Sequence, residues 1–205
     1  RPGGWIEAGF PPNIHLDRAG AARSGLGRDA FLREAAAALA GLDSVEALEG
    51  YVGERRPDDG DFRLFLTASA DLGLDRLGRA YDRFMSYGAY PAVAGEGRLF
   101  ARGIWEGTPG ALDTAAIVED LASSWMVGEA HHPARGMTRP DADKPGAYSW
   151  CKAPRLAGRP VEVGALARQV VDGHPLALDM AVKRGGNVMS RVVARLIEAA
   201  RLVLA

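Results

Sequence analysis

The sequence lacks several patterns that define whole classes of protein. Its only cysteine is Cys151, which excludes internal disulfides and cysteine-rich metal sites. The 25 Lys and Arg residues nearly balance the 26 Asp and Glu residues, so no global basic field exists to hold a nucleic acid or an anionic membrane. No apolar run approaches the roughly 20 residues that cross a bilayer, and no signal-peptide pattern opens the chain. We therefore expect neither nucleic-acid binding nor direct membrane insertion.

Motifs of the common catalytic sites are also missing. The chain has no Gly-x-Ser-x-Gly, no Walker loop and no Gly-x-Gly-x-x-Gly. The pair Gly185-Gly186 is too weak a signal to indicate a phosphate-binding loop, and no two carboxylates stand out by their spacing. The residue patterns alone therefore predict no catalytic constellation.

The composition nevertheless predicts a folded chain. Of its 205 residues, 47% are apolar and 25% are charged, which is enough to build a hydrophobic core. No internal repeat or low-complexity tract divides the sequence. The chain opens at Arg1 without a Met and stops at Ala205 within a helical pattern, so we expect residues 1–205 to be a single domain or a fragment of a longer protein.

Helical patterns cover much of the chain. The helices expected before the middle of the sequence span residues 28–40, 43–53, 62–73 and 74–85, with Asp43 or Ser44 as an N-cap. Those expected near its end span residues 164–171 and 187–204, and His174, which precedes a proline, looks like a helix boundary.

The final helix has the clearest pattern. Asn187 is a suitable N-cap for it. Its expected core face consists of Val188, Val192, Leu196 and Val203. Its expected solvated or interface face consists of Arg191, Arg195, Glu198 and Arg201.

Strand character is limited to residues 98–107, which lead into a turn at 108–110. Residues 115–126 fit a helix or a strand equally well. The first 13 residues and the segments 55–61 and 128–160 carry many Pro, Gly or charged residues and indicate irregular structure. The expected fold class is α+β, predominantly helical, with a small β-sheet and long irregular connections.

Only a few residues could carry chemistry. Glu129, His131 and His132 are the candidates for a metal site, because imidazole and carboxylate groups both ligate metals. Adjacent histidines rarely converge on one ion, however, and the alternative is a loop in which one His bonds to the backbone. Cys151 lies near basic residues that would favour its thiolate, and its alternative is a buried, inert thiol behind Trp150.

Residues 148–168, YSWCKAPRLAGRPVEVGALAR, resemble a conserved block of nickel–iron hydrogenase large subunits, Tyr-Ser-Trp-x-Lys-Ala-Pro-Arg followed by Glu-x-Gly-Pro-Leu-Ala. Before them, SSWMVGEAHHPARGMTRP resembles the family's Ser-Trp-Tyr, His-Pro, Gly and Thr-x-Pro segments. Earlier in the chain, RFMSYGAYP resembles the family's Asn-Phe-Leu-Ser-Tyr-Gly stretch, and ARGIWEG resembles its Arg-Gly-Val strand. Near the end of the chain, GGNVMSRVVARLIEAARLV resembles a family helix with paired arginines. These blocks cover residues 83–204 in the family's order, whereas residues 1–80 match only loosely.

The resemblance has departures as well as matches. Ala165 stands where the family usually has Pro, and Met126 where Tyr is common. Cys151 occupies a position that the family fills with apolar residues, which favours the buried thiol. Lys152 and Arg155 are expected to anchor the irregular segment 152–160 by hydrogen bonds to carbonyls and carboxylates, Glu162 among them. The residues that match family motifs, and for which we expect structural roles, are Trp125, Trp150, Lys152, Pro154, Arg155, Glu162, Gly164 and Arg168.

The resemblance implies a nickel–iron centre that cleaves or forms H2 and is held by four thiolates from two Cys-x-x-Cys motifs. Neither motif occurs in these 205 residues, so we assign no catalytic residue and no cofactor to this chain itself. We expect the inactive central section of a larger large-subunit fold, with the remainder of that subunit and an iron–sulfur small subunit as partners. The expected location is the cytoplasm, or the membrane surface through a partner subunit.

Two other interpretations remain. A large-subunit-like maturation scaffold without its own metal site would carry the same blocks and lack the metal-binding cysteines. An unrelated helical interaction domain is the third interpretation. A Cys-x-x-Cys on each side of this segment in the complete gene would indicate the enzyme.

Overall fold

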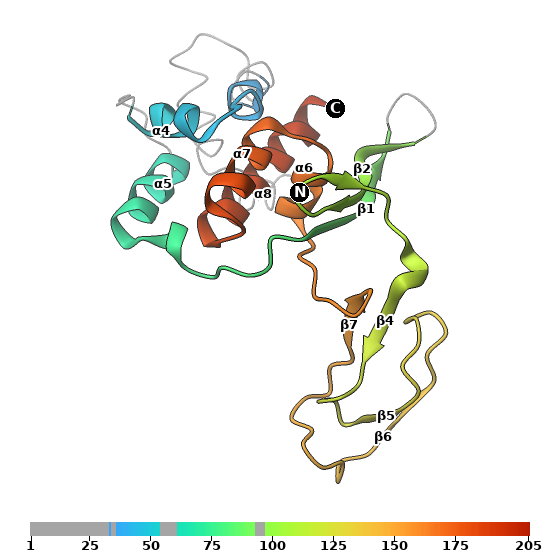
Figure 1. The fold of residues 1–205 in the computed structure, drawn as a ribbon. Coiled ribbons are helices and arrows are strands. Elements are labelled where there is room, and N and C mark those ends of the chain that lie inside the picture. Colours follow the sequence, from blue (N-terminus) through green and yellow to red (C-terminus); the bar gives the residue numbers. More distant parts are fainter. Residues whose placement is uncertain (1–32, 34–35, 54–60, 93–96) are drawn as a thin grey trace, which may run out of the picture.

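The structure is a computed structural model that describes residue 33 and residues 36–53, 61–92 and 97–205 (Figure 1). Its helices are α4 (Val45–Gly53), α5 (Asp61–Leu72), α6 (Ala165–Val171), α7 (Pro175–Arg184) and α8 (Val188–Leu204), with 3-10 turns η2 (Leu74–Arg76) and η3 (Thr114–Ala116). Its strands are β1 (Phe84–Pro91), β2 (Arg98–Trp105), β3 (Pro109–Gly110), β4 (Ile117–Asp120), β5 (Met126–Gly128), β6 (Thr138–Pro140) and β7 (Ala153–Leu156). The fold is thus a mixture of helix and strand with a small sheet.

Several predicted helices are confirmed. Residue 33 and residues 36–40 are helical, and the rest of the expected helix 28–40 lies outside the described residues, as do the expected irregular segment 1–13 and most of the loop at 55–61. Helices α4, α5, α6 and α8 lie where the sequence patterns predict them. No helix in the described ranges is both long and apolar enough to cross a membrane.

Helix α8 lies at the centre of a helical body formed with α4 to α7 (Figure 1). Its start is capped as expected, because the Asn187 side chain accepts a hydrogen bond from the Ser190 amide and Ser190 returns one to the Asn187 amide. The expected core face is confirmed only in part: Val188, Val192, Leu196 and Val203 are partly buried, and Leu196 and Val203 pack against the core cluster. The deeply buried residues of α8 are Met189, Ser190, Val193, Ala194, Ile197, Glu198 and Ala200.

The main sheet pairs β1 with β2 and β2 with β3, all antiparallel. Phe84 and Trp105 are direct partners in this register, and their rings lie 5.7 Å apart. Both pack against Leu166 of α6, so that helix lies on the sheet. The prediction of a helix over 74–85 is therefore wrong. Its apolar spacing fits a helix, but pairing with β2 and packing on α6 stabilise a strand that begins at Phe84.

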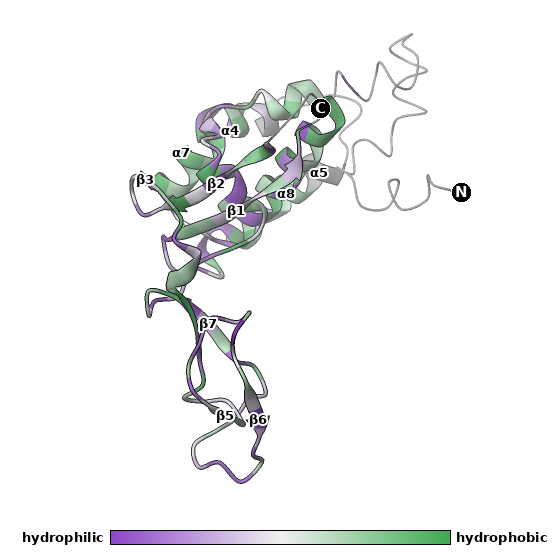
Figure 2. Cartoon of the chain, turned by 90° about the vertical axis from the view of Figure 1, so that its right-hand side faces the viewer, coloured by the Kyte–Doolittle hydropathy of each residue, from purple (hydrophilic) through white to green (hydrophobic). Residues whose placement is uncertain are grey.

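An arm extends from this body (Figures 1 and 2). At its base β4 pairs with β7, and farther out β5 pairs with β6, both antiparallel. Residues 115–126 therefore form a 3-10 turn and strands, which settles the ambiguity left by the sequence. The segment 128–160 is mostly irregular, as expected, with two short strands at 138–140 and 153–156.

Helix α7 is absent from the sequence-based predictions. His174 is its N-cap in an extended conformation, and Pro175 is its first residue, so the expected boundary at His174 is confirmed. The helix buries Leu176, Ala177 and Met180 against the two main core clusters of the described residues.

Candidate functional site

Most of the family-motif residues lie on the arm or at its junction with the body, and Arg168 lies in the body. Strands β5 and β7 belong to the arm, and the chain between them returns through Ser149, whose carbonyl accepts a 2.8 Å hydrogen bond from the Trp125 amide. This contact brings the Trp125 and Trp150 rings to a centroid distance of 5.1 Å. Two tryptophans that lie 25 positions apart thereby form one aromatic pair.

The exposure of this pair contradicts one expectation. Trp150 is 54% exposed, and Cys151 beside it is also exposed, so the prediction of a buried Trp150 and a buried, inert Cys151 is wrong. The Ser149 hydroxyl accepts a hydrogen bond from the Cys151 amide. Tyr148 and Met137 add two more exposed apolar side chains in the arm.

Lys152 forms the main ion pair of the arm. Its ammonium lies 2.8 Å from Oε2 of Glu119, whose side chain is only 9% exposed. Gly136 lies close to the same carboxylate, and a Cβ there would come within 2.9 Å of Oε2. Lys152 therefore does contact a carboxylate, as the sequence suggested, and a glycine leaves room for that carboxylate.

Arg155 does not have the anchoring role expected of it. Among the described residues, its guanidinium donates a hydrogen bond only to the neighbouring carbonyl of Pro154, whereas the Glu162 carboxylate is bound by Arg191. The buried Arg83 instead donates to the carbonyl oxygens of Leu156, at 2.7 Å, and Arg159, and also pairs with Glu106. The guanidinium that holds the bend therefore comes from the start of β1, more than 70 residues earlier in the chain.

Glu162 joins the arm to the body. Its carbonyl accepts a hydrogen bond from the Met85 amide, and its amide donates one to the Arg83 carbonyl. The backbone of Glu162 therefore pairs with the start of β1. Its carboxylate accepts two hydrogen bonds, of 2.8 and 2.9 Å, from Arg191 of α8, which raises the pKa of that guanidinium. A Cβ at Gly186 would come within 2.5 Å of the same carboxylate. The Gly185-Gly186 pair thus leaves space for an ion pair.

The face of α8 that was predicted to be solvated or an interface is solvated only at Arg195, and its other members pair with neighbouring segments. Glu198 is buried and accepts hydrogen bonds from Nε and Nη2 of Arg168, at 2.8 and 2.7 Å, and from Gln169. The Glu198 bond raises the pKa of Arg168. Arg201 pairs with Asp172 at 2.7 Å. Only Arg195 is exposed, as expected, because α6 covers this side of α8.

Gly164 and Pro154 lie at the two ends of the connection that leads into α6. Gly164 has φ +114°, a conformation that favours glycine, and directly precedes α6. Pro154 lies in β7 opposite Glu119. Both residues therefore shape the backbone, and neither brings a reactive group to a site.

The metal candidates are only partly brought together. His131 Nε2 lies 3.0 Å from a Glu129 oxygen, on an exposed loop, whereas Nδ1 of His132 accepts a hydrogen bond from the Ala134 amide. Across the described ranges, no three His, Cys, Asp or Glu side chains form a group that could hold a metal ion. A nickel–iron centre bound by several thiolates does not fit these residues, because the single thiol of Cys151 is exposed on the arm.

Comparisons with known proteins find relatives of this chain. The family model described as nickel-dependent hydrogenase matches residues 66–203. The periplasmic NiFeSe hydrogenase large subunit of Desulfomicrobium baculatum is 30% identical over 119 residues, which cover 56% of this chain and 23% of that protein. Its description as periplasmic does not support the cytoplasmic location expected from the sequence.

Solved structures share the fold. The Ni-Fe-Se hydrogenase of D. vulgaris Hildenborough in the reduced state has a TM-score of 0.61 and 24% identity, over 86% of this chain and 38% of that one. The reduced, active enzyme of Desulfomicrobium baculatum has a TM-score of 0.60 and 22% identity, over 86% of this chain and 37% of that one. The chain thus spans less than two fifths of these solved relatives.

Proposed function

The chain belongs to the nickel-dependent hydrogenase family, and we propose that it is the central section of a hydrogenase large subunit. The complete subunit would catalyse the oxidation or formation of H2. The observation that carries this proposal is the family match over residues 66–203, which includes the main sheet, the arm and helices α6 to α8.

The contacts of the family-like residues support a structural role for this section. Lys152 binds Glu119 within the arm, Glu162 binds Arg191 between arm and body, and Arg168 binds Glu198 within the body. Side chains that are engaged in this way position backbone, and they are not free to exchange protons with a substrate. We therefore assign the chemistry of the enzyme to parts of the large subunit outside this chain, and we expect the chain alone to be inactive.

The exposed aromatic surface of the arm is consistent with a partner. Trp150, Tyr148 and Met137 are 54%, 76% and 88% exposed, which is unusual for large apolar side chains that lie in one region of a protein. Tryptophan and tyrosine are also enriched in the buried centres of protein interfaces. We propose that the rest of the large subunit or an iron–sulfur small subunit covers this surface in the assembled protein.

The complete protein provides the test. It should be produced with its maturation system and any small subunit encoded beside it, then assayed for H2-dependent reduction of a viologen dye and for nickel content. A purified protein with about one nickel per large subunit and measurable H2 uptake is the expected result. A complete gene that encodes no Cys-x-x-Cys on either side of this segment, together with a nickel-free and inactive protein, would overturn it.

A large-subunit-like maturation scaffold is the second candidate. It is favoured by one observation, that the described residues hold no group of metal ligands although most of the family-like blocks are present. Such a scaffold would keep the arm and the ion pairs and would bind maturation proteins in place of a catalytic metal. Retention of maturation factors by the complete protein, without nickel and without H2 uptake, would favour this candidate over the enzyme.

A further inference from the structure

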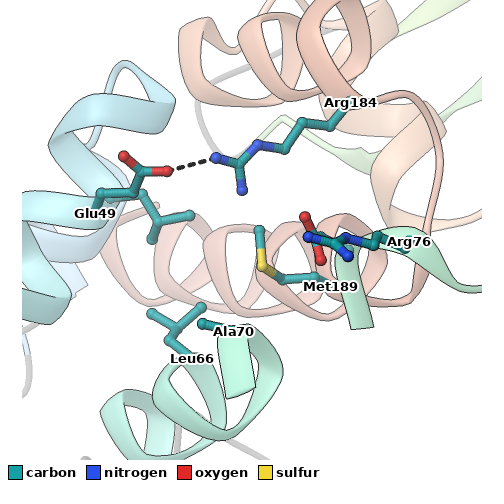
Figure 3. Close-up of a pocket in the computed structure, with 8 residues that line it drawn as sticks. Glu49, Leu66, Ala70, Arg76, Arg184 and Met189 are labelled. Carbon is teal, nitrogen blue, oxygen red and sulfur yellow. Dashed lines mark hydrogen bonds and ion pairs between the residues drawn. The ribbon is translucent and has the colours of Figure 1, made fainter. Parts of the chain in front are cut away.

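A pocket of about 320 Å³ lies away from the arm, where five elements of the helical body meet (Figure 3). Helices α4 and α5, the turn η2 and helices α7 and α8 all contribute to it. Its volume is at the lower end of the range for small-molecule sites. The residues that line it are Leu48, Glu49, Leu66, Ala70, Asp75, Arg76, Arg184 and Met189.

The floor of the pocket is apolar and fixed. Leu48, Leu66 and Met189 are 2%, 3% and 6% exposed and belong to one core cluster of the described residues. In Figure 3 the side chains of Leu66 and Met189 extend toward the same space. Side chains held in a packed core offer a preformed apolar surface, so a ligand would not have to order it on binding.

Charged groups of both signs surround that floor. Arg184 and Glu49 are paired across one side of the opening, as the dashed line in Figure 3 marks. Asp75 and Arg76 lie on the other side, and neither side chain has a hydrogen bond or ion pair with any residue that the structure describes. One carboxylate and one guanidinium at the same opening are therefore left available.

We propose that this pocket binds an apolar α-amino acid as its zwitterion. The carboxylate of the ligand would bind Arg76, its ammonium would bind Asp75, and its side chain would lie on the apolar floor. An isolated anion would be repelled by Asp75 and an isolated cation by Arg76, whereas a zwitterion satisfies both groups. A cavity of this volume can hold a leucine, a methionine or a phenylalanine.

The site does not follow from family membership. Leu48 and Glu49 lie outside residues 66–203, the part of the chain that the family model matches. The pocket therefore depends on how α4, which precedes that part, packs against α5 and α7. This inference is independent of the proposed function, because it concerns binding and no step of H2 chemistry.

Isothermal titration calorimetry and ligand-observed NMR on the 205-residue chain test the proposal with L-leucine, L-methionine and L-phenylalanine. We expect saturable binding of at least one of them. Isocaproate and isoamylamine, which lack the ammonium and the carboxylate of leucine, should bind at least tenfold more weakly, and glycine should not bind. Arg76→Gln and Asp75→Asn should each weaken binding at least tenfold, with unchanged circular dichroism.

Arg155→Gln is the matched control, since it removes an arginine that lies on the arm. It should leave the affinity unchanged. The proposal is overturned if none of the three amino acids binds at millimolar concentration, if isocaproate binds as tightly as leucine, or if Arg76→Gln binds like the unaltered chain.

Discussion

The helical body and the arm of this protein differ in how far their side chains are buried and paired. The body contains two of the core clusters, and several of its charged residues are paired in buried or half-buried positions, as Arg168 and Glu198 are. The arm has one small cluster near its base, which includes Ile117 and Leu156. Beyond that cluster its aromatic side chains are exposed, Trp150 among them.

This difference shows where each region obtains its stability. The body buries apolar surface against its own helices and sheet, and such burial is the dominant favourable contribution to folding. The arm is held mainly by short strand pairs, the Lys152–Glu119 ion pair and the aromatic pair of Trp125 and Trp150. We therefore expect substitutions in the body to affect stability, and most substitutions at the tip of the arm to affect association instead.

The largest effect is expected from Glu198→Gln in the body. The substitution removes a charge that two nitrogens of Arg168 contact in a buried position, and breaking such a pair typically costs about 3 kcal/mol of unfolding free energy. Glu129→Gln on the arm is the matched control, because the Glu129 side chain is 87% exposed, and it should cost less than about 0.5 kcal/mol. Urea titration followed by circular dichroism measures both, and equal losses would remove the contrast between the two regions.

A smaller effect is expected at Lys152, in the arm itself. Lys152→Met leaves the nearly buried carboxylate of Glu119 without its partner and should lower the unfolding free energy by about 1–3 kcal/mol. Arg155→Met, three positions later, should change it by less than about 0.5 kcal/mol, since the Arg155 side chain bonds only to the adjacent carbonyl among the described residues. Thermal unfolding of the two variants, measured under the same conditions, shows which substitution lowers the stability more. If Arg155→Met is the more damaging, Arg155 does anchor the segment after all.

A pH effect is expected from His174 in the body. Burial lowers the pKa of His174 below its ordinary value of 6.5, and its Nε2 bonds to the Ala40 carbonyl while Nδ1 has no partner among the described residues. The folded state therefore favours neutral His174. This contribution to stability is complete above pH 6.5 and is lost as the pH falls from there through the folded-state pKa, because the unfolded chain takes up the proton more readily.

The His174 effect can be isolated by comparison of variants. Unfolding free energies of the unaltered chain, His174→Gln and His131→Gln should be measured between pH 5 and 8. The decline below pH 6.5 should be shallower in His174→Gln and unchanged in His131→Gln, whose ring lies on the exposed loop of the arm. An unchanged pH dependence in His174→Gln would show that other groups cause the decline.

The smallest effect on stability is expected at Cys151. Because the side chain is exposed, Cys151→Ser should change the unfolding free energy by less than about 0.5 kcal/mol. The thiol of the folded chain should react with a maleimide at a rate close to that of the urea-unfolded chain, since access does not require opening of the structure. Protection of Cys151 in the folded, isolated chain would show that the arm is covered within this chain. Protection that arises only in the assembled protein would locate a partner on it.

The sequence alone was sufficient to predict the helices and strands that have a strong local pattern. Helix α8 was predicted from its apolar and charged positions and from Asn187, and β2 from its strand-forming residues. The family membership followed from short blocks whose order along the chain could be read directly. Patterns of this kind are local, because caps, turns and periodicity depend on residues within one or two turns of each other.

Only the tertiary structure determined which side chains meet. Arg83, rather than Arg155, binds the bend at residues 156–159, because the start of β1 packs against that bend from a distant part of the sequence. Part of the polar face of α8 is covered because α6 packs against it, so Glu198 and Arg201 are paired with Arg168 and Asp172, whereas Arg195 stays exposed. Trp150 is exposed because the arm carries it beyond the core. Each of these outcomes depends on contacts between distant segments, and hydrophobic patterns along the chain do not contain that information.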